Sequence, residues 1–173
     1  HAAQAIFYNQ DGSRVEMCGN GIRAVALHLT HGAPAPRTLL IETEGGLQQV
    51  WVDPTLKIAR VTLPPPTLQS PKEGELLTLP NHENALRFWE IGMGNPHAVI
   101  FVEDAQQITQ LVNTLGPQIE NHPRFPNRVN AEFVFASGPH ALQVAVWERG
   151  AGATLACGAG ACAAAVASLW LGH

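Results

Sequence analysis

Two stretches of the chain, MCGNGIRAVALHL from Met17 and ACGAGACAAAVASL from Ala156, are built alike. Each contains a cysteine, a glycine, one variable residue, a second glycine and then an apolar run rich in alanine. With the cysteines aligned, the identical pairs are Cys18/Cys157, Gly19/Gly158, Gly21/Gly160, Ala24/Ala163 and Ala26/Ala165. This repetition reflects either a shared way of packing two helices or a pair of matched reactive sites.

The repetition extends to the segments before the cysteines. Asn9 and Glu148 each lie nine residues before their cysteine, and each ends an apolar stretch, AIFYN or VAVWE. Both halves therefore predict the same order: a strand ending on a polar residue, a loop, the Cys-Gly-x-Gly element and a helix. This order predicts two similar α/β domains with equivalent half-sites.

A proline-rich segment separates the two halves. The run LPPPTLQSPKEGE holds four prolines and one glycine in 13 residues, so no central strand or helix is expected to continue through it. We therefore expect an N-terminal domain at residues 1–63, a linker at 64–75 and a C-terminal domain at 76–173. The chain opens at His1 within a strand-like pattern and shows no signal peptide, so we expect it to be part of a longer protein.

The same patterns predict the individual elements. Gly45-Gly46 is expected to form the turn of a hairpin, and helices are expected at 21–29, at 104–120 and after Cys157. Residues 155–171 carry no charge, but alanine and glycine dominate there, which favours a buried helix over a membrane span. The expected strands are 2–9, 37–53 (the hairpin), 56–63, 85–104 (two strands), 129–136 and 140–150.

Composition narrows the function classes. A hydrophobic content of 46%, 14% charged residues and a net charge of -4 indicate a globular protein and argue against a nucleic-acid partner. Three cysteines argue against a disulfide framework and favour a reducing, cytoplasmic compartment. Cys162 is expected to be a buried apolar residue of the alanine run. Cys157 and Cys162 lack the further ligands that a zinc site needs, so no metal is expected.

A cysteine at the start of a helix has a special electrostatic position. The first backbone N–H groups have no partners within the helix, and the helix dipole adds partial positive charge there. Thiolate is favoured at such sites, so we expect the pKa of each thiol to fall toward neutrality. The glycines allow a ligand to approach the backbone, and the same N–H groups can then bind a carboxylate.

Two such elements facing each other suggest a specific reaction. A small acid between them would have one sulfur on each side of its α-carbon. One thiolate would remove the α-proton while the opposite thiol donated one to the other face, which inverts the centre. Neither Lys57 nor Lys72 lies in a pocket-like context, so pyridoxal phosphate has no evident anchor and no cofactor is expected.

Four motifs together resemble the diaminopimelate epimerase family. They are YNQDGSRVEMCGNGIRA, GNPHAV, RVNAEF and WERGAGATLACGAGACAAA, in this order along nearly the whole chain. The resemblance implies two pseudo-symmetric domains, each a β-sheet wrapped around a central helix, with the active site in the interdomain cleft. It also implies a cofactor-independent isomerase that interconverts LL- and meso-2,6-diaminoheptanedioate in lysine and peptidoglycan precursor biosynthesis.

The resemblance also implies roles for individual residues. Cys18 and Cys157 would be the acid/base pair, assisted by His97 and Glu148. The substrate-binding residues would be Asn9, Gly19, Asn20, Asn95, Asn130, Glu148, Arg149, Gly158 and Ala159. The expected partner is a small amino acid, with neither nucleic acid nor membrane involved, and a homodimer is one assembly open to the protein.

Ala159 departs from the family pattern, which usually has serine or threonine after the second Cys-Gly. The missing hydroxyl removes one hydrogen bond to substrate, worth about 0.5–1.5 kcal/mol. Family members also begin before this chain and continue beyond it, so the chain alone is expected to lack a complete cleft.

Other functions stay open at this point. A proline or hydroxyproline racemase shares the fold and a Met-Cys-Gly-x-Gly element, and a phenazine-pathway isomerase shares the fold without the paired cysteines. A non-catalytic module that binds carboxylate at two helix ends is a further alternative, as is a redox protein in which Cys18 and Cys157 form a disulfide.

Overall fold

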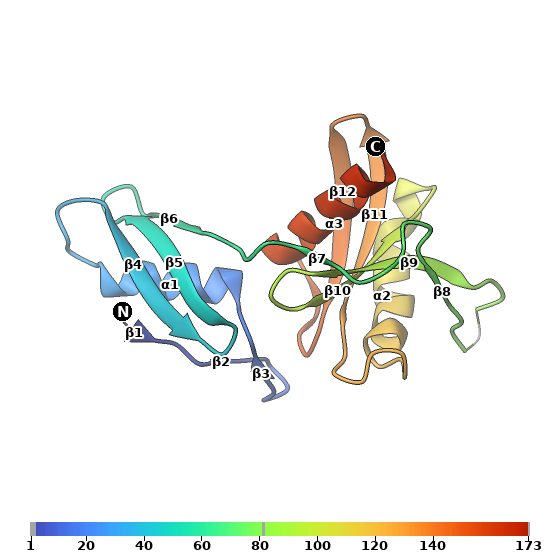
Figure 1. The fold of residues 1–173 in the computed structure, drawn as a ribbon, viewed down its shortest axis with the longest axis horizontal. Coiled ribbons are helices and arrows are strands. Elements are labelled where there is room, and N and C mark those ends of the chain that lie inside the picture. Colours follow the sequence, from blue (N-terminus) through green and yellow to red (C-terminus); the bar gives the residue numbers. More distant parts are fainter. Residues whose placement is uncertain (1–2, 81, 173) are drawn as a thin grey trace. The chain divides into compact units, whose positions relative to one another are not determined.

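The structure is a computed structural model that describes residues 3–80 and 82–172. The chain divides into two compact units, His1–Pro64 and Pro65–His173. Each is an α/β arrangement (Figure 1), and each has a hydrophobic cluster of its own. The α/β fold class predicted from the sequence is confirmed. Among the described residues, no helix is long and apolar enough to cross a membrane.

The first unit is a four-stranded sheet with one helix against it. The strand order is β1-β4-β5-β6, with β1 parallel to β4 and the other neighbours antiparallel. Ile22 and Ala26, one turn apart on the helix, are buried against the sheet residues Ile41 and Val50. The elements are β1 (Ala3–Gln4), β2 (Phe7–Tyr8), β3 (Arg14–Val15), α1 (Gly19–Leu29), β4 (Arg37–Thr43), β5 (Gly46–Asp53) and β6 (Ile58–Val61).

Two features of this unit were expected differently. The hairpin is confirmed, but its turn is Glu44-Gly45 and not the expected Gly45-Gly46. The single strand expected at 2–9 is, over its described residues, two short strands. The Ala5 N–H donates to the carbonyl of Glu42, which continues the pairing of β1 with β4. Phe7 then pairs with Val15 in a separate two-stranded ribbon, β2-β3. This ribbon leads directly into α1.

The second unit has a larger mixed sheet in the order β13-β12-β11-β10-β9-β7, with β8 also paired to β9. β10 and β11 are parallel, and the other neighbours are antiparallel. The elements are β7 (Thr67–Leu68), β8 (Glu75–Leu77), β9 (Leu86–Gly92), β10 (Pro96–Phe101), the short 3-10 helix η1 (Ala105–Gln107), α2 (Ile108–Glu120), β11 (Asn130–Gly138), β12 (Ala141–Glu148), β13 (Gly152–Thr154) and α3 (Gly158–Leu171).

The pleat of β10 and β11 decides which side chains meet which helix. Ala98, Ile100, Ala131 and Phe133 belong to the core cluster that contains the buried face of α2. Because side chains alternate along a strand, the intervening residues point to the opposite face, where α3 packs on the same strands. These intervening residues are His97, Val99, Asn130 and Glu132. The polar side chains are thereby directed toward α3.

The proline-rich segment 64–75 is more than a linker. Thr67–Leu68 within it forms β7, which pairs with β9 at the edge of the second sheet. A strand flanked by prolines can still pair at the edge of a sheet, because only one side of an edge strand needs hydrogen bonds.

The short strand β13, which pairs with β12 at the other end of the sheet, was not expected from the sequence.

Candidate active site

The two cysteines occupy the same structural position in their units. Cys18 is the N-cap of α1, with φ -127° and ψ 104°, and Cys157 is the N-cap of α3, with φ -125° and ψ 110°. Each sulfur accepts a hydrogen bond of 3.3 Å from the N–H three residues later, Gly21 or Gly160. The repeated sequence therefore encodes a repeated local geometry, a thiol capping the start of a helix.

The two glycines of each element have different purposes. A Cβ on Gly19 or Gly158 would have no atom within 4 Å, so the backbone there is open to a ligand. A Cβ on Gly160 would lie 2.6 Å from Glu132 Oε1, and one on Gly21 would lie 2.7 Å from the Phe7 ring. The second glycine of each pair is therefore needed for close packing against a strand residue.

The expected fall in the pKa of the thiols is wrong for Cys157. Burial, followed by the negative charge of Glu148, raises the pKa of this thiol from 9.0 to about 12, and Glu132 adds to the rise. The N–H groups of Gly160 and Ala159 act in the opposite direction but are outweighed. Desolvation and two carboxylates thus exceed the effect of the helix N-terminus.

Glu148 lies at the end of β12, close to Cys157. Its carboxylate accepts a short hydrogen bond from the hydroxyl of Thr154 on the neighbouring strand β13. Thr154 therefore fixes the orientation of the carboxylate beside the thiol. This partner was not predicted from the sequence, because β13 is only three residues long.

Asn130 connects the strands that carry the other predicted residues. Its Nδ2 donates to the carbonyl of Pro96 at 2.8 Å, and its Oδ1 accepts from the N–H of Arg149 at 2.9 Å. Arg149 is itself buried, and its guanidinium donates to the carbonyl of Asn127 at 3.3 Å. The Asn130 amide therefore holds the ends of β10, β11 and β12 together.

The turn after Glu148 has a second anchor that the sequence did not reveal. Glu120, buried at the end of α2, accepts from the N–H of Gly150 at 2.8 Å, from Trp147 Nε1 at 2.6 Å and from Arg128 at 3.1 Å. Three donors satisfy this buried carboxylate, so it fixes the backbone of the Glu148–Arg149 turn.

His97 is fully buried, with both ring nitrogens in hydrogen bonds. Nδ1 lies 2.6 Å from Glu132 Oε1, and Nε2 lies 2.8 Å from Asn95 Oδ1. Glu132 is also fully buried, and with Glu120 it is one of two carboxylates here that were not predicted from the sequence. Its place in the RVNAEF motif was the only available signal.

The predicted residues of the first unit lie at the start of α1 and in the loop between β2 and β3. Asn9 donates from Nδ2 to Ser13 Oγ at 3.1 Å and closes the loop between β2 and β3. The side chain of Asn20 accepts a short hydrogen bond from Arg23 one turn later. Gly19 and Asn20 thus follow Cys18 at the open end of the helix.

All three cysteines are free thiols. Cys162 is exposed on α3, so the expectation that it is buried is wrong. The helix is apolar around its whole circumference, and its buried residues include Ala163, Ala164 and Ala167, which leaves Cys162 on the opposite face. No cluster of three or more His, Cys, Asp or Glu side chains in the described part of the chain could hold a metal ion.

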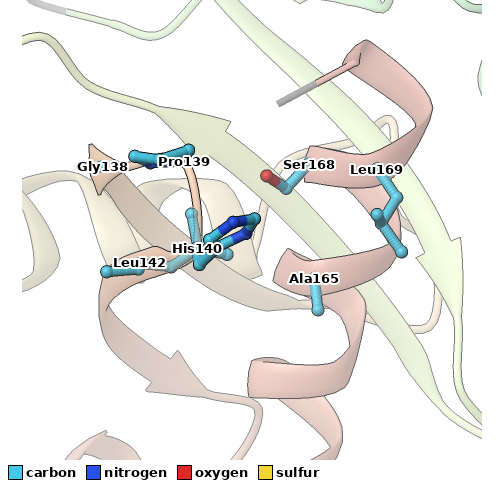
Figure 2. A pocket seen from close by; sticks show the side chains of 8 residues that line it. Gly138, Pro139, His140, Leu142, Ala165, Ser168 and Leu169 are labelled. Atoms are coloured by element: carbon cyan, nitrogen blue, oxygen red, sulfur yellow. The ribbon is translucent and has the colours of Figure 1, made fainter.

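A cavity of about 310 Å³ lies away from these residues, between α3 and the tip of the β11-β12 hairpin. Figure 2 shows His140 and Leu142 of the hairpin on one side and Ala165, Ser168 and Leu169 of the helix on the other. It contains none of the predicted site residues.

Comparison with known proteins gives a consistent result. The sequence profile described as diaminopimelate epimerase matches residues 90–173. Diaminopimelate epimerases of Pseudomonas syringae pv. tomato and of a Picosynechococcus species are 41% and 42% identical, over 94% and 96% of this chain. The chain spans only 60% and 63% of their lengths.

A solved structure matches the fold at low sequence identity. A hydroxyproline epimerase from Agrobacterium vitis, with bound trans-4-hydroxy-L-proline, has a TM-score of 0.72 and 16% identity. The match covers 98% of this chain and 57% of that one. At this level of identity the likeness concerns the fold alone.

Proposed function

The chain belongs to the diaminopimelate epimerase family, and we propose that the protein of which it is part interconverts LL- and meso-diaminopimelate. The observation that carries the proposal is the matched pair of thiols, each capping a helix whose first backbone groups are open to a ligand. A carboxylate is the natural ligand of such helix ends.

The proposed reaction is a proton exchange at one α-carbon. One sulfur, as thiolate, takes the α-proton, and the electron pair passes into the carboxylate, whose negative charge the helix ends stabilise. The other sulfur, as thiol, gives its proton to the opposite face. No electrons are gained or lost, and the two sulfurs have exchanged protonation states after each turnover.

The raised pKa of Cys157 favours this sulfur as the proton donor at the start of one direction, with Cys18 as the base. Glu148, fixed by Thr154, acts at the Cys157 proton, and His97 assists from its buried position. The groups proposed to bind substrate are Asn9, Gly19, Asn20, Asn95, Asn130, Glu148, Arg149, Gly158 and Ala159.

Deuterium incorporation tests the proposal. The full-length protein in deuterated water should introduce deuterium at one α-carbon of diaminopimelate, as measured by mass spectrometry and NMR. Cys18→Ala and Cys157→Ala should each abolish inversion, because one sulfur serves only one face. Absence of exchange with the intact wild-type protein would end the proposal.

A proline and hydroxyproline assay belongs beside it, because the fold is shared with a hydroxyproline epimerase. Racemisation of proline without any action on diaminopimelate would replace the proposed substrate while keeping the two-thiol chemistry. We further propose that the enzyme works in the cytoplasm, needs no cofactor and acts on a free amino acid, with a homodimer as the assembly to be tested by light scattering.

A further inference from the structure

Glu132 is a buried carboxylate to which the proposed reaction gives no task. Its side chain is fully buried on β11, and one oxygen lies 2.6 Å from Nδ1 of the equally buried His97. The other oxygen, Oε2, has no hydrogen-bond partner among the described residues. Burying an ionisable group in this way is costly, so a purely structural strand position would favour an apolar residue.

Glu132, His97 and Asn95 form a chain of hydrogen bonds, with Glu132 at its buried end. The Asn95 Oδ1 atom can only accept, so His97 Nε2 must carry the proton of that 2.8 Å bond. Glu132 Oε1 accepts a second hydrogen bond from Nδ1 of the same ring, so the ring donates from both nitrogens and Glu132 is a carboxylate. The ring cannot rotate without breaking both bonds. The amide of half-buried Asn95 is therefore held with its oxygen toward His97 and its Nδ2 donor away from it.

Glu132 also lies directly beneath the start of α3. A Cβ on Gly160 would come within 2.6 Å of Glu132 Oε1, and the N–H of the same Gly160 donates to the Cys157 sulfur. The carboxylate and the thiol thus contact the same helical turn. A negative charge in this position disfavours thiolate, in agreement with the contribution of Glu132 to the raised pKa of Cys157.

We propose that Glu132 is a positioning residue that acts in two ways: through His97 it fixes Asn95 as an outward hydrogen-bond donor, and its charge beneath the first turn of α3 adds to the burial and the Glu148 charge that favour the thiol form of Cys157. The first action rests on the proposed function, since the acceptor for Asn95 is then a carboxylate of the amino-acid substrate. The second action is independent of any substrate.

Two substitutions separate the two actions in the full-length protein. Glu132→Gln removes the charge but keeps a side-chain amide beside His97 Nδ1. Glu132→Ala removes both the charge and the hydrogen bond. Glu103→Gln, a change at an exposed carboxylate outside the site, is the matched control. Circular dichroism and urea unfolding identify variants that are folded.

The first readout is alkylation of Cys157 by iodoacetamide at pH 9, followed by peptide mass spectrometry in a Cys18→Ser/Cys162→Ser background. Both Glu132 variants should react about two- to threefold faster than the parent, because Glu132 adds less to the raised pKa of Cys157 than burial and Glu148 do, and the control should not change. The second readout is steady-state kinetics with the native cysteines. Glu132→Ala should raise the KM for diaminopimelate about tenfold, whereas Glu132→Gln should leave it near the wild-type value.

Unchanged alkylation in folded Glu132→Gln overturns the charge action, and an unchanged KM in folded Glu132→Ala overturns the action on Asn95. A third measurement needs no variant: the ¹⁵N spectrum of the wild-type protein should show a protonated Nε2 in His97, and an unprotonated Nε2 overturns the chain of hydrogen bonds. Failure of the wild type to epimerise any substrate would instead reject the proposed function, while the alkylation and ¹⁵N results would still decide the role of Glu132.

Discussion

Replacement of Cys157 by serine should change how stability depends on pH. Serine keeps an oxygen acceptor at the N-cap of α3, where Cys157 now accepts from Gly160, and it does not titrate in the accessible range. The thiol does titrate, and its pKa is raised from 9.0 to about 12 in the folded protein by burial and by Glu148. The wild type and Cys157→Ser should therefore diverge at alkaline pH.

The sign follows from proton binding. Above pH 9 the unfolded chain loses the thiol proton while the folded protein retains it, so unfolding releases a proton and stability falls as pH rises. The stabilising contribution is complete below pH 9 and is lost as pH rises through the folded value near 12. The loss is about 1.4 kcal/mol per pH unit within this window, or about 2 kcal/mol at pH 10.5.

Urea unfolding of both proteins at intervals from pH 8 to 10.5 measures the effect. The difference in unfolding free energy between wild type and Cys157→Ser cancels the titration of all other groups. This difference should be constant below pH 9 and should shift by about 2 kcal/mol against the wild type at pH 10.5. A difference that stays constant across the whole range would refute the assignment of Cys157 as a desolvated thiol beside carboxylates.

Three further substitutions follow from the packing and hydrogen bonds, each measured by urea unfolding at pH 7. Gly160→Ala should destabilise the protein by about 1–3 kcal/mol, because the new Cβ would lie 2.6 Å from Glu132 Oε1. Gly158→Ala, whose Cβ would have no atom within 4 Å, should destabilise it less. Equal losses of stability in the two variants would contradict the close approach at Gly160. Asn130→Ala should cost about 2–4 kcal/mol, because the Pro96 carbonyl and the Arg149 N–H lose their shared partner; a loss below 1 kcal/mol would show that water replaces the amide. Glu120→Gln should cost about 2 kcal/mol or more, because one oxygen cannot accept from Trp147, Gly150 and Arg128 together; unchanged stability would mean that the turn is not anchored there.

The sequence predicted those parts of the fold that local rules govern. The start of each Cys-Gly helix follows from a capping residue and two glycines, and the β4-β5 hairpin follows from a Gly-Gly pair between alternating strands, although its turn lies one residue earlier than predicted, at Glu44-Gly45. The strand expected at 2–9 was predicted less well, because its structure depends on which strands it pairs with. Ala5 donates a hydrogen bond to Glu42 at the end of the β1-β4 pairing, whereas Phe7 pairs with Val15. Such choices depend on residues distant in the chain.

The candidate site divides in the same way. Both thiols and their capping geometry could be read from the sequence, because a helix N-terminus is a local structure. The pKa of Cys157 could not, because its causes depend on the fold: burial, and the charges of Glu148 and Glu132 on the two separate strands β12 and β11. Cys162 shows a further limit. A helix that is apolar on every side does not reveal which face is covered.

The second glycine of each element shows that two equal helix starts rest on different supports. Gly21 has no Cβ because the ring of Phe7 occupies the space beneath the first turn of α1, whereas Gly160 has none because Glu132 occupies the equivalent space beneath α3. The repeat thus conserves the helix start and changes what supports it, an apolar ring in one unit and a buried carboxylate in the other. The carboxylate beneath α3 adds, after burial and Glu148, to the raised pKa of Cys157, whereas the Phe7 ring carries no charge. The asymmetry therefore lies beneath the repeated motif and outside the residues that repeat.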